Sequence, residues 1–236
     1  RRSVIIEPVP RERLADLDRD ALILAMAQWA SYQVSIWHEL AQWYGWSILA
    51  VYPERVSGFS PEDLFSNAVG VRLLEGMDLR RVLASEKIYN RTVDALMIRE
   101  LERLGPVPKQ VSGDAVRAVD DVWWDSKERL PETSLVRRRH LDALENVEPW
   151  LLPNAQTPPD LVGELEKHCG ASPRPERIRI ADSYEGVSFG DHLTLEITVN
   201  DSLARKPAFA SNGGRVTQQD FARLVEVFDR NNVTFV

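Results

Sequence analysis

A histidine and a glutamate stand side by side, as His38 and Glu39, inside the apolar segment WHELAQWYGW of residues 37–46. Imidazole nitrogens and carboxylate oxygens are common zinc ligands, and a carboxylate can also act as a general base. In zinc hydrolases of one well-defined pattern, a second histidine follows the first by one helical turn, but Gln42 occupies that position here. Because a carboxamide is a poor zinc ligand, His38 needs partners from elsewhere in the chain. The alternative is a histidine that forms hydrogen bonds within the core.

The expected metal site combines His38 with a carboxylate from a second helix. Consecutive helical residues point about 100° apart, so His38 and Glu39 cannot easily bind one ion together. We therefore predict His38 and Asp63 as metal ligands and Glu39 as the general base or second ligand, with a divalent metal, zinc first, as the cofactor. A serine nucleophile at Ser35 has little support, because the sequence has no GxSxG motif and a serine within a helix usually bonds its own backbone. The polar residues expected to support the metal site are Ser35, Gln42, Glu62 and Asn67.

These residues lie in the first two helices that the sequence predicts. The first helix opens at Asp16 or Asp18, either of which suits an N-cap, and runs without proline or glycine to Gly45. It is apolar on most sides, so its polar residues form a stripe on an otherwise buried helix. An unpaired buried polar group costs about 1–3 kcal/mol. The stripe therefore predicts either a polar cavity or a set of hydrogen bonds to neighbouring helices.

The second and third helices follow a loop. Ser60 and Pro61 suit the N-cap and the first position of the second helix, and the acids Glu62 and Asp63 fit its positive end without any ligand role. A third helix is expected over residues 79–104, ending at Gly105. Its predicted core face consists of Leu83, Ile88, Val93, Leu96, Met97 and Leu101.

Beyond Trp124 the pattern changes from long helices to short strands. The predicted elements are strands at 135–141, 178–181, 187–189 and 193–199, a helix at 160–168, and a last amphipathic helix capped by Thr217. The predicted fold class is α+β and predominantly α-helical, a bundle of long helices with a small, mostly antiparallel sheet from the C-terminal part and an edge strand at residues 3–6. We expect one domain over residues 1–236, with a helical part at about 11–124 and a mixed part at about 125–236.

The composition limits the partners of the chain. Its 236 residues are 44% hydrophobic and include seven tryptophans, which is typical of a folded globular protein. The net charge of −7 argues against general binding to nucleic acids or anionic membranes, and the basic run at 136–140 is more simply the end of a strand or loop. A single cysteine, Cys169, excludes an intrachain disulfide and a cysteine-based metal site. The sequence shows no transmembrane segment, and small-molecule, peptide and glycan partners all stay open.

Three segments, WHELAQWYGW, FSPEDLFSNAVGVRL and VEPWLLP, resemble a bacterial family, the domain of unknown function numbered four thousand and fifty-six. The resemblance covers most of the chain and is strongest over residues 37–74. It implies a longer protein, with a further histidine and acidic residues ahead of Arg1. His38 and Glu39 would then be half of a split site. The family itself implies no activity.

The start of the chain bears on its compartment. Because the sequence begins at Arg1 without methionine and enters a strand at once, we expect a fragment or a processed product. With an export signal upstream, the bacterial envelope or periplasm is expected, and otherwise the cytoplasm.

Two functions are consistent with these patterns. The first is a metal-dependent hydrolase with its site along the polar stripe of the first helix. The second is a non-catalytic envelope or scaffold domain that binds a protein or glycan partner, with Trp43, Tyr44 and Trp46 in the core. The surroundings of Glu39 distinguish them: a water-accessible cavity with other acids or histidines favours the enzyme, and a carboxylate sealed against an arginine or backbone amides favours the scaffold.

Overall fold

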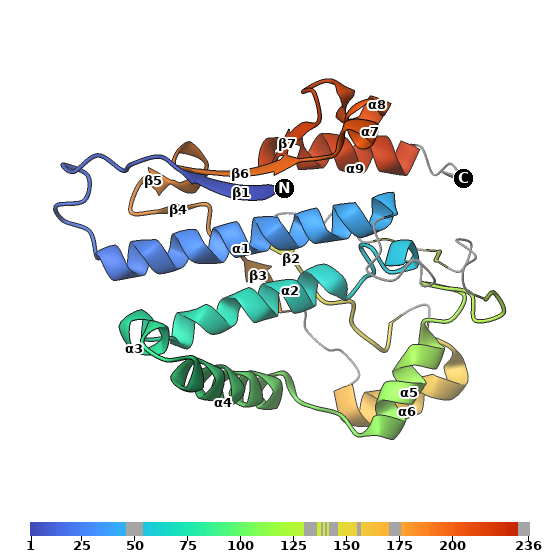
Figure 1. Ribbon diagram of the computed structural model, residues 1–236. Coiled ribbons are helices and arrows are strands. Elements are labelled where there is room, and N and C mark those ends of the chain that lie inside the picture. The colour runs from blue at the N-terminus through green and yellow to red at the C-terminus, as the bar shows by residue number, and fades with distance from the viewer. Residues whose placement is uncertain are drawn as a thin grey trace. The chain divides into compact units, whose positions relative to one another are not determined.

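The computed structural model describes residues 1–45, 54–129, 136–137, 139, 141, 146–154, 157–169 and 176–230. The chain forms two compact units: the first unit is Arg1–Trp46 with Ile180–Val236, and the second unit is Ser47–Arg179. The predicted fold class is confirmed, because helices dominate and the small sheets are antiparallel, with most strands from the C-terminal region (Figure 1). The expectation of a single domain stays a prediction. None of the described helices combines the length and the apolar character that crossing a membrane requires.

The first unit is built around α1 (Arg19–Tyr44), a helix of 26 residues. Asp18 caps it, since its carboxylate accepts hydrogen bonds from the backbone N–H groups of Asp20 and Ala21 at 3.0 and 3.1 Å. Gly45 ends it with a φ of 110°, a left-handed conformation that glycine adopts without strain. Both predicted ends of the first helix are therefore confirmed.

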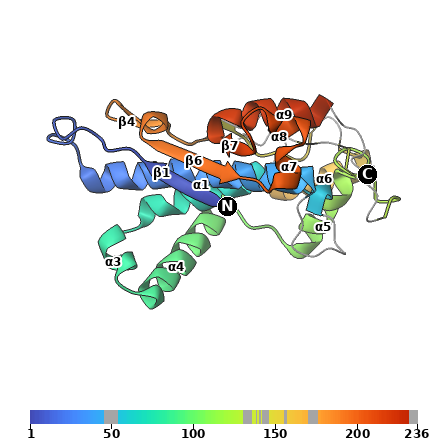
Figure 2. The ribbon, with the colours of Figure 1, turned by 45° about the horizontal axis from the view of Figure 1, so that its top comes forward.

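A three-stranded antiparallel sheet lies along α1 in the order β1 (Arg2–Ile6), β6 (Leu193–Thr198) and β7 (Arg215–Thr217). Figure 2 shows β1 and β6 side by side from a second direction. Val4 of β1 pairs with Leu195 of β6, and Glu196 pairs with Thr217 of β7. Alternate residues of β6 are buried, which is the period expected of a strand with one face on the core. The strand predicted at the start of the chain is thus an edge strand, as expected.

Aromatic rings join α1 to the last helix, α9 (Phe221–Arg230). Trp37 stacks on Phe221 with ring centroids 6.2 Å apart, and Trp43 meets Phe228 edge to face at 5.7 Å. Such pairs contribute roughly 0.5–1.5 kcal/mol each beyond the area they bury. Tyr44 also contacts Phe228, so the aromatics that end α1 belong to the packing of this unit, as the scaffold interpretation expects of Trp43 and Tyr44. Trp46 lies outside the described residues.

The other elements of the first unit are short. Leu22 and Trp29 in the first half of α1 pack in one hydrophobic cluster with Phe189 of these short elements. The predicted cap at Thr217 is confirmed, because Thr217 and Asp220 form a capping box ahead of α9. These elements are β4 (Ser183–Tyr184), β5 (Val187–Ser188), η4 (Phe189–Asp191), α7 (Asp201–Ala204), α8 (Pro207–Ala210) and η5 (Gln218–Asp220).

The second unit consists mainly of helices. A small apolar cluster of Val111, Ala118, Leu161 and Leu165 holds two of them, α5 and α6, together. The elements of this unit are η1 (Glu54–Val56), α2 (Asp63–Arg72), η2 (Leu73–Gly76), α3 (Leu79–Leu83), α4 (Glu86–Leu104), α5 (Lys109–Ala118), β2 (Asn146–Val147), α6 (Pro159–Cys169) and β3 (Ile178–Arg179).

The single helix predicted over residues 79–104 is wrong, because two helices, α3 and α4, meet at Ser85. Ser85 has an extended backbone, with φ −162° and ψ 127°, which ends one helix and starts the next. Serine favours such a position over a helix interior. The predicted core face is also partly wrong: Leu96 is buried, but Leu83, Met97 and Leu101 are exposed.

The remaining predicted elements have mixed outcomes. The helix at 160–168 is confirmed as α6, and the strands at 178–181, 187–189 and 193–199 are confirmed as the shorter β3, β5 and β6. The strand expected at 135–141 falls largely outside the described residues. Of that segment, Val136 forms an isolated bridge with Trp124.

Candidate functional site

His38 and Glu39 lie in the C-terminal half of α1, in different surroundings. Glu39 is only 4% exposed, whereas His38 is half-buried and reaches a pocket of about 220 Å³ in the first unit. The rotation of about 100° between consecutive helical residues explains the difference. The described residues that line the pocket are Arg1, Arg2, Trp37, His38, Ala41, Ile197, Thr198, Val199 and Leu203.

Four separate segments build the walls of this pocket. The pairing of β1 with β6 places Arg2 opposite Ile197, and the Thr198 N–H donates to the carbonyl oxygen of Arg1 at 2.9 Å. On the helical side, the stacking of Trp37 on Phe221 fixes the orientation of α1. The short helix α7, which brings Leu203, starts at the cap Asn200, whose side chain accepts from the Leu203 N–H at 2.9 Å. The pocket is therefore held by strand pairing, ring packing and a helix cap.

The charges around the pocket are those of an anion site. Two arginines and a histidine line it, and no carboxylate belongs to the described residues of its lining. Guanidinium groups bind carboxylates and phosphates through charge-assisted hydrogen bonds, which are roughly twice as strong as neutral ones. The same positive charge opposes the binding of a divalent cation. The site residues predicted from the sequence do not include Arg1, Arg2 or Trp37. The signal in the sequence for the two arginines is their position directly before an apolar strand.

The other predicted residues of α1 lie along its polar stripe. The Ser35 hydroxyl donates to the carbonyl oxygen of Tyr32 at 2.8 Å, which is the local bond expected of a serine within a helix. The carbonyl oxygen of Gln42 accepts from the Gly45 N–H at 2.9 Å and helps to end the helix. A supporting role of Ser35 and Gln42 in a metal site stays a prediction.

Glu62, Asp63 and Asn67 belong to the second unit, at the start of α2. The Asp63 carboxylate accepts a hydrogen bond from the Ser60 N–H at 2.8 Å, so it serves the start of this helix. Glu62 is exposed and is the N-cap residue of α2, but its side chain makes no capping hydrogen bond. The structure therefore accounts for Asp63 as a helix-start acid, and its role as a ligand stays a prediction.

A partly buried arginine, Arg139, lies close enough to Asp63 for their charges to interact. Burial, and then the charge of Arg55, lower the pKa of the Arg139 guanidinium to about 10, and Asp63 acts in the opposite direction. Arg139 donates hydrogen bonds to the carbonyl oxygens of Gly58 and, at 2.9 Å, Arg55. The predicted basic run at 136–140 thus supplies one residue that holds the loop before α2; Arg138 and His140 lie outside the described residues.

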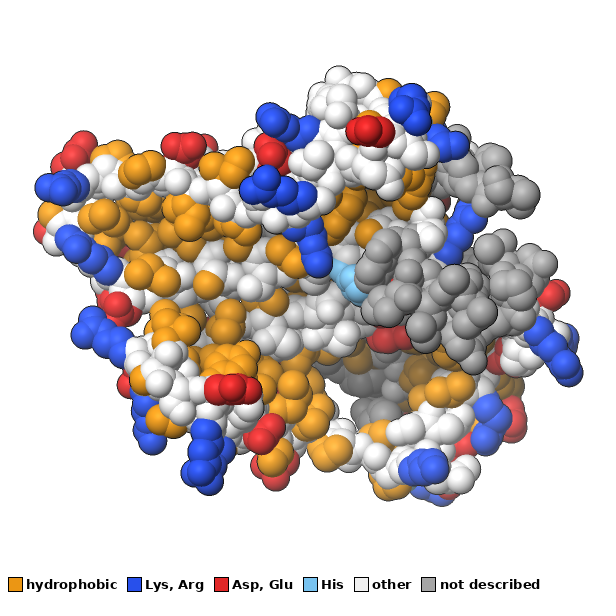
Figure 3. All heavy atoms as spheres, in the orientation of Figure 1, with side chains coloured by type: hydrophobic (Ala, Val, Ile, Leu, Met, Phe, Trp, Pro, Cys, Tyr) orange, Lys and Arg blue, Asp and Glu red, His pale blue; other side chains and the backbone are white. Residues whose placement is uncertain are grey.

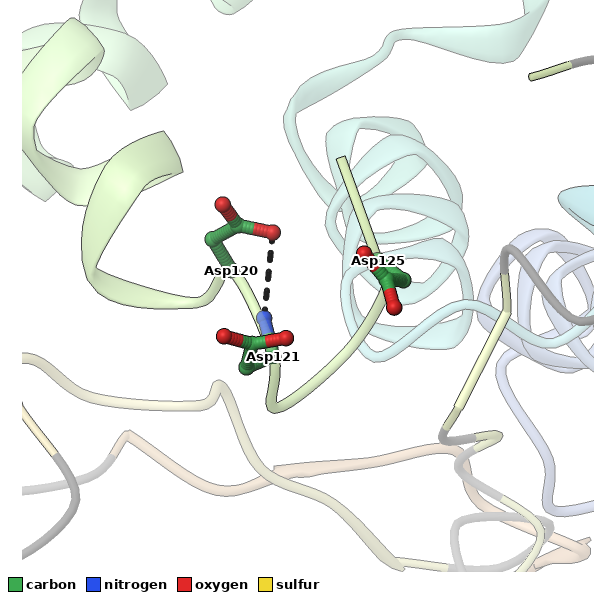
Figure 4. A group of neighbouring side chains, drawn as sticks. All are labelled: Asp120, Asp121 and Asp125. Atoms are coloured by element: carbon green, nitrogen blue, oxygen red, sulfur yellow. Dashed lines mark hydrogen bonds between the residues drawn. The ribbon is translucent and has the colours of Figure 1, made fainter. Parts of the chain in front are cut away.

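Three acidic side chains gather at the end of α5, as Figure 4 shows for Asp120, Asp121 and Asp125. Among the residues that the structure describes, these are the one group of three acids, histidines or cysteines whose ligand atoms could share an ion, all lying within 4.8 Å of one another. The Asp120 carboxylate, however, accepts from the backbone N–H of Ser126 at 2.9 Å and from its hydroxyl at 2.6 Å. These bonds lower the pKa of Asp120 below its usual value.

The third acid of this group is engaged in the same way. Asp125 accepts from the Lys127 N–H at 2.9 Å and from the Arg137 guanidinium, and both bonds lower its pKa. Arg137 also pairs with Asp121 at 3.3 Å. The three acids therefore organise their own loop through protein partners, and the spacing DDVWWD was the sequence signal for this cluster.

The N-terminal two thirds of the chain match a known protein family. No curated protein and no solved structure shows significant similarity to this chain. A family model described as "Protein of unknown function (DUF4056)" matches residues 2–153, which is more than half of the chain. That range includes β1, α1 and α2, and so the residues predicted for the metal site. The chain therefore belongs to the DUF4056 family.

Proposed function

We propose that this chain is a non-catalytic ligand-binding domain whose pocket beside His38 takes a small organic acid. The observation that carries the proposal is the convergence of Arg1, Arg2, Trp37 and His38 on one hollow, with no carboxylate among the described residues that line it. Arginine supplies charge-assisted hydrogen bonds to an acid group, and the apolar side chains of the lining suit the remainder of such a ligand.

The size of the pocket limits the ligand. At about 220 Å³ it is smaller than the roughly 300–1,000 Å³ of sites that hold drug-sized molecules. A ligand of the size of benzoate or a short-chain fatty acid fits this space. Larger partners, a peptide or a glycan, would enter with one terminal group.

The proposal is tested with benzoate and its neutral analogue benzamide. We expect benzoate to shift the backbone amide signals of residues 37–41 and 197–203 in a nitrogen–proton correlation spectrum, and benzamide to bind at least tenfold more weakly. A hydrogen bond to a charged group contributes about 1.5–3 kcal/mol, which corresponds to such a difference. Equal binding of the two compounds, or no binding of either, would contradict the proposal.

Matched variants localise the binding. Arg2→Gln and His38→Gln should each weaken benzoate binding by about tenfold, because each removes one polar group from the pocket. Arg11→Gln removes the same charge from an exposed position outside the lining and should bind as the unaltered protein does. If Arg11→Gln weakens binding as much as Arg2→Gln, the effect is one of net charge and the pocket is not the site.

Metal-dependent hydrolysis by His38, Glu39 and Asp63 is distinguished by the metal content of the same preparations. A bound zinc ion that is lost in His38→Gln would support the hydrolase over the anion pocket. Equally negligible metal in both proteins would leave the hydrolase without its cofactor.

A further inference from the structure

The turn between α3 and α4 carries exposed apolar side chains. Leu83, the last residue of α3, is 82% exposed, and Tyr89 in the first turns of α4 is 44% exposed. A single exposed apolar residue needs no explanation, whereas apolar side chains that gather on the surface and are rimmed by polar residues can mark a site for a partner or a membrane. The surroundings of Leu83 therefore decide what this turn could meet.

Basic side chains surround Leu83. Residues 78–91 contain four cationic and two acidic side chains, whereas the whole chain has a net charge of −7. Figure 3 shows basic and hydrophobic side chains next to one another over α3 and the start of α4. One of the two acids, Asp78, caps α3 by accepting from the Arg81 N–H at 3.2 Å. The turn is thus a local positive region on an acidic protein.

Three of these cations, Arg81, Lys87 and Arg91, are exposed and take part in none of the ion pairs found in the described part of the chain. Lys87 and Arg91 are one helical turn apart on α4, a spacing at which like charges repel by a few tenths of a kcal/mol. An external anion would relieve this repulsion.

Two of the arginines face one hollow. Arg81 of α3 and Arg91 of α4 both line a pocket of about 290 Å³, and its other described lining residues are Ile88, Thr92, Ala95 and Leu96. Two arginines, a threonine and three apolar residues therefore line the hollow, and no described acid belongs to its lining. Such a combination suits a phosphodiester that continues into a hydrocarbon chain.

We propose that the α3–α4 turn docks on an anionic phospholipid surface, with Leu83 inserted among the acyl chains and a headgroup phosphate between Arg81 and Arg91. The charge of the turn is complementary to such a surface, and Leu83, its most exposed apolar side chain, lies between the cations in the sequence. This is the arrangement of an interfacial anchor, in which apolar burial and attraction to anionic lipids act together. The binding is peripheral and reversible.

Sedimentation of the full chain with vesicles tests the proposal. We expect binding to vesicles of phosphatidylcholine and phosphatidylserine at seven to three, little binding to phosphatidylcholine alone, and a strong decrease at high salt. Arg81→Gln with Arg91→Gln should lower the partition coefficient about thirtyfold, at about fivefold for each cation. Leu83→Ser should lower it by about tenfold through loss of apolar burial.

Control variants come from the other end of α4. Arg99→Gln and Leu101→Ser alter an exposed cation and an exposed apolar residue outside the turn, and both should bind vesicles as the unaltered protein does. Circular dichroism verifies that all variants are folded. Equal binding to both vesicle types, or equal loss in the control variants, would overturn the proposal. Binding of a phosphoserine peptide without any vesicle binding would also overturn it, in favour of a protein partner.

Discussion

His38 and Glu39 are neighbours in the sequence but face different surroundings, and this difference bears on both expected functions. His38 reaches a pocket with arginines, and Glu39 is almost fully buried. A general base must meet its substrate, so the predicted role of Glu39 requires access to a residue that is only 4% exposed. Whether the Glu39 carboxylate faces other acids and histidines or is sealed against an arginine or backbone amides stays a prediction, and the decision between the two expected functions depends on it. At this scale the sequence predicted which residues are unusual, and it could not predict which of them faces a pocket.

A first prediction concerns the cap of α1. Asp18→Ala should lower the free energy of unfolding by about 1 kcal/mol, because the backbone N–H groups of Asp20 and Ala21 lose their acceptor. Asp16→Ala is the matched control, since Asp16 is exposed and the change should stay within about 0.5 kcal/mol. Urea denaturation followed by tryptophan fluorescence measures both. Equal losses in the two variants would show that Asp18 does not act as the cap.

An ion network joins three elements of the second unit. Arg72 at the end of α2 pairs with Glu100 of α4 and with Glu176, which precedes β3. Arg103 binds Glu100 through two nitrogens, at 2.7 and 2.8 Å, and Glu176 at 2.8 Å. Two arginines and two glutamates thus alternate in one group that links α4 to α2. The exposed apolar residues of α4 are consistent with this mode of attachment.

The network predicts a loss of stability in acid. The Arg103 hydrogen bonds, and then Arg72, lower the pKa of Glu100 from 4.5 to about 2. A carboxyl whose pKa is lower in the folded state stabilises the fold above its unfolded pKa, and this stabilisation is lost as the pH falls from about 4.5 towards 2. Because the Arg103 side chain is 45% exposed, solvent screening limits the contribution of Glu100 to roughly 1–2 kcal/mol.

Glu100→Gln tests this prediction. The variant should be less stable at pH 7 and should lose less stability than the unaltered protein between pH 4.5 and pH 3. Some acid sensitivity should persist, because hydrogen bonds from Arg103 and Arg72 also lower the pKa of Glu176. Glu102→Gln, an exposed carboxylate on the same helix, is the control and should keep the original pH dependence. Urea titrations of each protein at pH 7, 4.5 and 3 measure the free energy of unfolding. The same loss of stability between pH 4.5 and pH 3 in both variants would contradict the prediction.

The sequence predicted most elements correctly, and the prediction failed where the apolar period of a helix ran through a serine that favours a helix end. Residues 79–104 have the apolar period of one helix, but Ser85 takes an extended backbone and divides them. The apolar period also assigned Leu83, Met97 and Leu101 to the core, although they are exposed. A periodic pattern shows that apolar residues share a face, but only packing decides whether that face is covered.

At the scale of the molecule, the chain divides into units that do not follow its order. The first unit combines the N-terminal segment with residues 180–236, and the second unit is the segment between them. Each has its own apolar cluster: Trp29 and Phe189 belong to that of the first unit and Leu165 to that of the second. Because each of these two clusters lies within one unit, we predict that damage to one cluster leaves the other unit intact.

Hydrogen exchange measures this independence. Leu165→Ala removes a side chain that is 1% exposed and should destabilise its surroundings by about 2–5 kcal/mol. We expect faster amide exchange in α5 and α6 and unchanged exchange in β6. Leu195→Ala, at 3% exposure in β6, is the reciprocal change and should affect the first unit. Faster exchange in both units after either change would instead support the single cooperative domain that the sequence predicted.

The sequence by itself determined the local features of this protein. The ends of α1, the capping box of Thr217 and Asp220, the alternation of β6 and the predominantly helical fold class all follow from signals within a few residues of one another. The tertiary structure alone decided what lies around His38. The pocket combines residues of β1, α1, β6 and α7, and it forms because β1 pairs with a strand almost two hundred residues away. That pairing depends on burial against α1, which no local pattern contains.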